Sequence, residues 1–114
     1  MRREAKKYLF DIATAARHIM SFTEGKTFQD YQDDALLRSA VERQFEIIGE
    51  ALAQLARLDA ELVAHITDYR RIIAFRNILV HGYAQIDDLL VWDIVETKLP
   101  PLYAQVTSLL GEQP

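Results

Sequence analysis

The stretch that decides the fold is residues 33–58, which read DDALLRSAVERQFEIIGEALAQLARL. Its apolar side chains recur three or four positions apart and include Leu37, Val41, Phe45, Ile48, Leu52 and Leu55. Such a stripe is typical of a long helix that buries one face in a core. Gly49 lies inside the stretch, at a cost of about 1 kcal/mol relative to alanine. Either another backbone approaches the helix closely at Gly49, or the helix tolerates the glycine.

The same apolar spacing predicts helices on both sides of this stretch, over about residues 3–22, 69–80, 88–98 and 100–111. Their ends are marked by residues that cap or break helices, which are Gly25, Asp59, Asp68, Gly82, Asp87 or Asp88, Pro100 and Pro101. Residues 28–31 are expected to be a connecting segment. The predicted fold is therefore all-α, an up-and-down bundle of about four main helices plus short helices, in a single domain over residues 1–114.

The composition excludes several classes of function. Of the 114 residues, 50% are hydrophobic and 26% are charged, which is ordinary for one globular domain. The chain has no cysteine, so a disulfide framework, a thiolate zinc site and a cysteine nucleophile are all excluded. The basic N-terminus is not followed by a signal-peptide apolar stretch, and no apolar run reaches the roughly 18 residues of a membrane span. We therefore expect a cytoplasmic protein.

The charge is unevenly distributed. A net charge of −4 argues against broad electrostatic capture of nucleic acid, which relies on clustered lysine and arginine. Arg70, Arg71, Arg76 and His81 nevertheless gather in one short stretch. If RNA is bound, we expect it to be bound there.

The candidate chemistry lies in residues 76–83, which read Arg76-Asn77-Ile78-Leu79-Val80-His81-Gly82-Tyr83. On a helical wheel, the apolar sector contains Ile72, Phe75, Ile78 and Leu79, and a narrow polar stripe contains Arg70, Ala74, Asn77 and His81. Because Asn77 and His81 are four positions apart, a hydrogen bond from Asn77 could orient the histidine. Asn77 and Arg70 are thus candidates for binding or orienting a substrate.

Arg76 lies at the margin of the apolar sector. A charge buried there without a partner is costly, so Arg76 should meet a carboxylate, a phosphate or an interface. On an intact helix, Arg76 and His81 point about 140° apart. Either the helix unwinds at His81, or the two side chains meet across a dimer. We expect Arg76 to find its partner at an interface.

Arginine and histidine together suit RNA cleavage without a metal ion. Histidine exchanges protons near neutral pH, and the arginine fork can hold a phosphate while negative charge develops on it. The RNA 2′-hydroxyl would be the nucleophile, and its attack would give a cyclic phosphate and a free 5′-hydroxyl. In this reading His81 is the general base or acid and Arg76 is the electrostatic stabiliser. The alternative is a structural histidine near a helix end.

Residues 76–83 resemble the Arg-x4-His-x-Tyr signature of the HepT-like branch of the HEPN superfamily, with Arg76, His81 and Tyr83 at its fixed positions. Asn77 also matches the common family form. Residues 40–51, which read AVERQFEIIGEA, are similar to that branch's long-helix signature. The similarity continues through residues 73–83, 91–95 and 99–100, so it covers nearly the whole chain.

This resemblance implies a homodimer whose two motifs line a shared cleft. It also implies a metal-independent ribonuclease without a cofactor, acting as the toxin of a toxin–antitoxin pair. The antitoxin would be an MntA-type minimal nucleotidyltransferase that transfers AMP from ATP onto Tyr83, which would block the site by bulk and negative charge. The alternative is a non-catalytic HEPN dimer that serves as a binding partner or modification target of a nucleotidyltransferase.

The other notable polar and aromatic residues are assigned to structure, ion pairing or the surface rather than to catalysis. Glu42, Glu46 and Glu50 form a like-charged stripe that is either solvated or supplies a partner for Arg76, Arg70 or Arg71. His18 and His65 are assigned to structure or surface. Trp92 is expected to be a core or dimer contact rather than a base-stacking platform.

Overall fold

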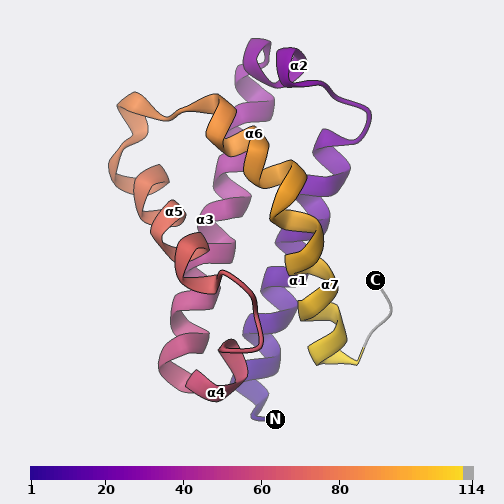
Figure 1. The fold of residues 1–114 in the computed structure, drawn as a ribbon, viewed down its shortest axis with the longest axis vertical. Coiled ribbons are helices and arrows are strands. Elements are labelled where there is room, and N and C mark those ends of the chain that lie inside the picture. The colour runs from indigo at the N-terminus through magenta and orange to yellow at the C-terminus, as the bar shows by residue number, and fades with distance from the viewer. Residues whose placement is uncertain (112–114) are drawn as a thin grey trace.

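The computed structural model describes residues 1–111, and all regular structure in that range is helical. Four columns run alternately up and down (Figure 1): α1 (Arg3–Thr23), α3 (Ala35–Leu58), α5 (Tyr69–His81), and finally α6 (Asp88–Thr97) followed by α7 (Leu99–Leu110). The connections contain α2 (Phe28–Asp33), α4 (Ala60–Val63) and the 3-10 turn η1 (Tyr83–Gln85). The predicted all-α bundle is confirmed. The predicted domain extends to residue 114, and residues 112–114 lie outside the described range.

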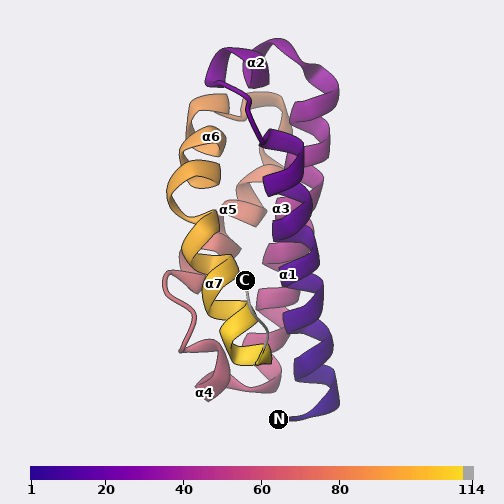
Figure 2. The ribbon, with the colours of Figure 1, turned by 90° about the vertical axis from the view of Figure 1, so that its right-hand side faces the viewer.

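Helix α3 is the centre of the bundle. It packs against α1 and against α5, and α7 packs on α1 (Figure 2). All six residues of its predicted apolar stripe are buried, as the helical spacing requires. The ring of Phe45 meets the ring of Phe75 edge-on, with 5.2 Å between centroids. This contact packs α5 against α3. Helix α3 begins at Ala35 because the Asp34 side chain caps it by accepting the Leu37 N–H.

The prediction of a connecting segment at residues 28–31 is wrong, because these residues belong to helix α2. Thr27 and Asp30 form a capping box at its start: the Thr27 hydroxyl accepts the Asp30 N–H at 3.1 Å, and the Asp30 carboxylate accepts the Thr27 N–H at 2.9 Å. Fully buried Tyr31 packs against Trp92, with 5.5 Å between ring centroids and the ring planes tilted by 37°. Helix α2 therefore covers one end of the core.

The two predicted aspartate caps differ. Asp59 caps α4 by accepting the Leu62 N–H at 3.0 Å, as predicted. Asp68 occupies the capping position of α5 but adopts a left-handed φ of 61°, and its side chain does not cap. Its carboxylate instead accepts a hydrogen bond from Lys98 Nζ at 3.0 Å, and this bond lowers the pKa of Asp68. The Asp68 side chain thus ties the start of α5 to the α6–α7 junction.

Candidate active site

Helix α5 carries most of the candidate residues and is buried along one face only. Ile72, Phe75 and Leu79 are buried, as the wheel predicts, and the Phe75 ring meets Phe45 of α3. Ile78 was expected in the same apolar sector, but its side chain is 48% exposed. The reason is that α6 packs on α2 and α7 rather than closely on α5. The side of α5 that faces α6 therefore stays open.

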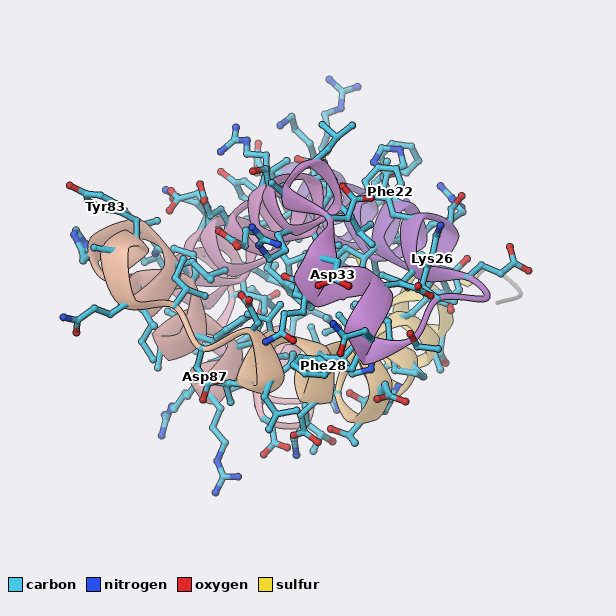
Figure 3. All side chains as sticks on the ribbon, turned by 90° about the horizontal axis from the view of Figure 1, so that it is seen from above. Phe22, Lys26, Phe28, Asp33, Tyr83 and Asp87 are labelled. Atoms are coloured by element: carbon cyan, nitrogen blue, oxygen red, sulfur yellow. The ribbon has the colours of Figure 1, made fainter. Side chains whose placement is uncertain are left out.

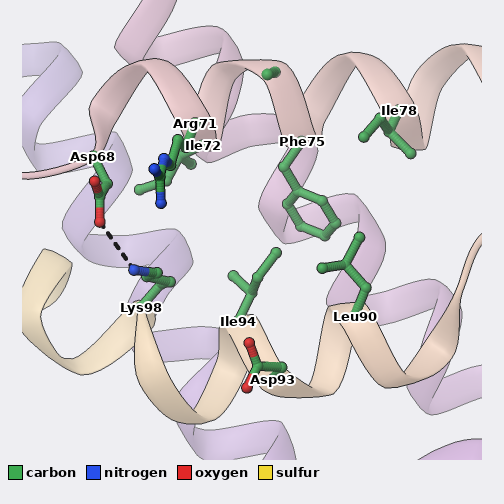
Figure 4. A pocket seen from close by; sticks show the side chains of 10 residues that line it. Asp68, Arg71, Ile72, Phe75, Ile78, Leu90, Asp93, Ile94 and Lys98 are labelled. Atoms are coloured by element: carbon green, nitrogen blue, oxygen red, sulfur yellow. Dashed lines mark hydrogen bonds and ion pairs between the residues drawn. The ribbon is translucent and has the colours of Figure 1, made fainter.

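This opening is a groove of about 300 Å³ between α5 and α6 (Figure 4). Its apolar wall is formed by Ile72, Phe75, Ile78, Leu90 and Ile94. The ion pair between Asp68 and Lys98 closes one end. At the other end, the groove reaches Ile78, less than one helical turn before His81.

Arg76 rests directly on the backbone of α3. A Cβ atom built on Gly49 would lie 2.2 Å from Arg76 Cβ and 2.6 Å from Arg76 Cγ, so only glycine leaves room for the arginine. Of the two alternatives for Gly49, the structure confirms the close approach, which is made by the first carbons of Arg76. Arg76 Nη1 forms an ion pair with Glu50 Oε2 at 3.3 Å, and the Arg76 side chain is 20% exposed.

We expected Arg76 to find its charged partner at an interface between chains. This expectation is wrong, because the carboxylate that pairs with Arg76 lies in the same chain. Gly49 brings the arginine across α3 to Glu50, the next residue. The stripe of three glutamates thus supplies the partner of Arg76, which was one of the two alternatives predicted for it. Gln54, which was not among the residues predicted for the site, donates from Nε2 to Glu50 Oε1 at 2.9 Å. The spacing of four residues between Glu50 and Gln54 could have indicated this contact, because side chains four positions apart are neighbours on a helix.

Among the ion pairs of residues 1–111, neither of the other two carboxylates of the stripe pairs with α5. Glu46 pairs with Arg43 of its own helix at 3.4 Å. Glu42 is partly buried, and burial together with the nearby Asp88 carboxylate raises its pKa. Glu50 is therefore both solvent-exposed, at 54%, and the partner of Arg76, whereas Glu46 is 30% exposed and pairs within its own helix.

His81 is the last residue of α5, and the helix is intact up to that point. The N–H of Gly82 donates to the Ile78 carbonyl at 2.7 Å, which completes the last helical turn. A Cβ on Gly82 would lie 2.9 Å from the same carbonyl oxygen, so glycine fits where the helix ends. His81 is exposed. The alternative in which the helix unwinds at His81 is thus wrong, and the predicted break at Gly82 is confirmed.

An intact α5 keeps Arg76 and His81 apart within one chain. The two residues point about 140° apart around the helix axis. Arg70 and His81 stand on the same stripe but about 16 Å apart along the axis, and Arg70 Nε donates to the Tyr69 hydroxyl at 3.1 Å. Asn77 is exposed one turn before His81, and no hydrogen bond joins these two side chains. The proposed site residues therefore share one helix without converging.

Tyr83 begins η1 and is 80% exposed. Its side chain projects outward from the edge of the molecule (Figure 3). Exposed apolar side chains also occur at the end of α5 and the start of α6, namely Ile78, Val80, Leu89 and Leu90. The exposed histidine and the exposed phenol thus lie two positions apart at one edge of the bundle.

The remaining candidates take structural or surface positions. Trp92 is buried in the core, as predicted. Exposed His18 stacks on Phe22, and His65 is exposed after α4. Within residues 1–111, no three His, Cys, Asp or Glu side chains gather as a metal site would require. No helix of that range combines the length and apolar character needed to cross a membrane.

Comparisons with known proteins cover most of the chain. The family described as Ribonuclease HepT-like matches residues 12–109. A Thermococcus cleftensis protein named "Probable ribonuclease HepT" is 34% identical over 109 residues, which are 96% of this chain and 98% of that protein. A Methanocaldococcus jannaschii protein named "Putative RNase" is 31% identical over 105 residues, which are 92% of this chain and 95% of that protein. No solved structure matches the chain at a significant level.

Proposed function

Because this chain belongs to the Ribonuclease HepT-like family, we propose that it is an endoribonuclease that needs no metal ion and acts as the toxin of a toxin–antitoxin pair. The assignment as a ribonuclease rests on membership of this family. The observation that supports His81 as its proton carrier is the exposure of this residue at an intact helix end, where a large substrate can reach it. Arg76 is the cation of the same segment.

The proposed reaction uses the substrate's own nucleophile. The RNA 2′-hydroxyl loses its proton and attacks the adjacent phosphorus, while the bond from phosphorus to the 5′-oxygen breaks. The products are a 2′,3′-cyclic phosphate and a 5′-hydroxyl, which takes up a proton. His81 removes the first proton or donates the second. The Arg76 guanidinium stabilises the negative charge that builds up on the phosphate oxygens.

The separation of Arg76 and His81 on α5 makes a homodimer part of this proposal. Two side chains about 140° apart on one helix do not converge on one phosphate, whereas Arg76 of one chain can face His81 of a second. The exposed apolar residues near the end of α5 support association at this edge, because exposed apolar surface of this kind commonly marks a protein contact.

The function is tested by incubating total RNA with the wild type and with His81→Ala in the presence of a metal chelator. We expect the wild type to produce fragments that end in cyclic phosphate. His81→Ala should cleave about 10²- to 10⁴-fold more slowly, since general acid–base groups contribute rate factors of that size. Chemical mapping of the fragment ends and rates from gel densitometry provide the measurement.

Background cleavage by both proteins would overturn the ribonuclease proposal. His65→Ala is the matched control, because it removes an exposed histidine outside the motif. It should cleave like the wild type. Loss of activity in both histidine variants would point to a general effect of the substitutions rather than to the chemistry of His81.

Neutralisation is proposed to occur at Tyr83, by an MntA-type nucleotidyltransferase. The exposed Tyr83 hydroxyl would attack the α-phosphorus of ATP, so that a phosphorus–oxygen bond to Tyr83 forms and pyrophosphate leaves. The attached AMP would carry bulk and negative charge two residues from His81. RNA phosphate would then be repelled from the site.

Incubation with such a nucleotidyltransferase and ATP is expected to add AMP to the wild type but not to Tyr83→Phe. Intact-protein mass spectrometry measures the addition, and peptide mass spectrometry locates it. Tyr103→Phe serves as the control, because Tyr103 lies on α7 and is partly buried, and it should be modified like the wild type. Undiminished AMP addition to Tyr83→Phe would place the modification at another residue.

The second candidate function is a non-catalytic dimer that binds, or is modified by, a nucleotidyltransferase. The observation that favours it is the ion pair between Arg76 and Glu50 within one chain, which satisfies the arginine without RNA. In that case the wild type would gain AMP on Tyr83 yet leave RNA intact in the chelator experiment. The two experiments together therefore separate the candidates.

A further inference from the structure

Two adjacent residues of α3 hold Arg76 in different ways. Gly49 gives its side-chain stem a place on the helix backbone, and Glu50 pairs with its guanidinium. We propose that Gly49 and Glu50 are positioning residues, which fix the Arg76 guanidinium before RNA binds. The proposal rests on the proposed function for the role of Arg76, and it adds two residues outside the Arg-x4-His-x-Tyr segment.

The first carbons of the Arg76 side chain are held against α3 at Gly49. Arg76 Cβ and Cγ fill the space where any other residue at position 49 would place its own Cβ. Flexible side chains lose conformational freedom when they are held in one geometry. With its first carbons pressed onto α3, Arg76 has lost part of that freedom before a substrate arrives. The direction in which the guanidinium leaves α5 is thereby set.

The guanidinium of Arg76 is held by the Glu50 carboxylate. Glu50 Oε2 lies 3.3 Å from Arg76 Nη1, and Glu50 Oε1 accepts the Gln54 hydrogen bond at 2.9 Å. Both carboxylate oxygens are thus engaged, and Glu50 is itself held in place. A guanidinium has five N–H donors. An ion pair through Nη1 therefore leaves donors for a phosphate.

The exposure of Glu50 allows its loss to be tested for a positional role. The Glu50 side chain is 54% exposed, so solvent screens its attraction to Arg76, although Arg76 itself is only 20% exposed. Glu50 also neutralises a charge that would otherwise attract phosphate. It should therefore weaken RNA binding slightly, while orienting Arg76 for the step in which negative charge develops on the phosphate.

These two effects act on different kinetic constants. If Glu50 positions Arg76, its loss lowers kcat, because the guanidinium is misplaced when charge develops. If Glu50 only masks the charge, its loss lowers KM and leaves kcat unchanged. The structure favours the first outcome, since Gly49 and Gln54 fix both partners of the pair.

The test compares Glu50→Gln, Glu50→Asp and Glu46→Gln with the wild type on a fluorescently labelled, mixed-sequence single-stranded RNA. Glu50→Gln should lower kcat about tenfold or more with little change in KM. Glu50→Asp keeps the charge and should retain more of the rate than Glu50→Gln. Glu46→Gln is the matched control, one turn earlier on α3 and paired only with Arg43. Its kinetics should match the wild type.

A second readout does not depend on cleavage. Arg76 Nε is buried, so its proton should exchange slowly with water in the NMR spectrum of the wild type. Exchange should accelerate in Glu50→Gln and stay slow in Glu46→Gln. An unchanged rate in Glu50→Gln overturns the positioning role, as does a lower KM with unchanged kcat. A wild type that does not cleave RNA overturns the proposed function instead, and the exchange measurement still tests the positioning.

Discussion

Mixing the Arg76→Ala and His81→Ala variants is expected to restore RNA cleavage that neither variant shows alone. Each variant should be at least about a hundredfold slower than the wild type, because each removes one half of the proposed chemistry. Within one chain, intact α5 holds the two side chains on different sides of the helix. The site proposed above therefore combines Arg76 of one chain with His81 of another.

The expected recovery can be estimated from random pairing. Equal amounts of the two variants, unfolded together and refolded, form mixed dimers in half of all cases, and each mixed dimer contains one intact site out of two. Cleavage should thus return to about a quarter of the wild-type rate. Initial rates on total RNA measure the recovery, and light scattering confirms that the proteins are dimers.

Each variant refolded with itself is the control and should stay inactive. If mixed dimers form and remain inactive, Arg76 and His81 do not complement each other across the interface. That result would leave an intact α5 without a way to bring both groups to one phosphate. A wild type that is active as a monomer would contradict the shared site more directly.

Replacing Gly49 by alanine is expected to destabilise the fold by about 1–2 kcal/mol, although alanine is the better helix former. Alanine inside a helix is favoured over glycine by about 1 kcal/mol. Here its Cβ would lie 2.2 Å from Arg76 Cβ, which cannot rotate away, so α5 must move from α3. Overpacking of this kind costs about 1–3 kcal/mol and occasionally more. Urea unfolding measures the difference.

Position 39 of the same helix provides the matched comparison, because Ser39 is exposed on α3. There the alanine variant should be more stable than the glycine variant by about 1 kcal/mol. The order should reverse at position 49. Equal or greater stability of Gly49→Ala would mean that α5 does not rest on this glycine.

Much of the fold follows from the sequence, because the apolar period of residues 33–58 identifies a helix that must bury one face in a core. The break at Gly82 also follows from local residue chemistry, which left the close approach at Gly49 as one of two alternatives. The role of Asp68 does not follow from such chemistry. Its partner Lys98 is distant in sequence, and nothing local distinguishes a capping aspartate from one that bonds elsewhere. Ile78 was misplaced for a related reason, since its exposure depends on the path of α6.

The candidate site could be only partly predicted. Helical geometry was sufficient to separate Arg76 from His81, and an arginine at an apolar margin was sufficient to require a partner. The choice of Glu50 over Glu42 and Glu46 depends on where α5 crosses α3, which the sequence does not specify. Helix α2 was missed because its capping box uses Asp30 where glutamate or glutamine is more common.

Tyr83 and His81 are two positions apart, one at the start of η1 and the other at the end of α5. A group attached to the Tyr83 hydroxyl would therefore be carried two residues from the histidine in every modified subunit, whatever the RNA sequence. If Tyr83 is modified as proposed, its control is binary at each site. A half-inhibited population would be a mixture of active and silent sites, and its rate would count the unmodified sites rather than report slower chemistry.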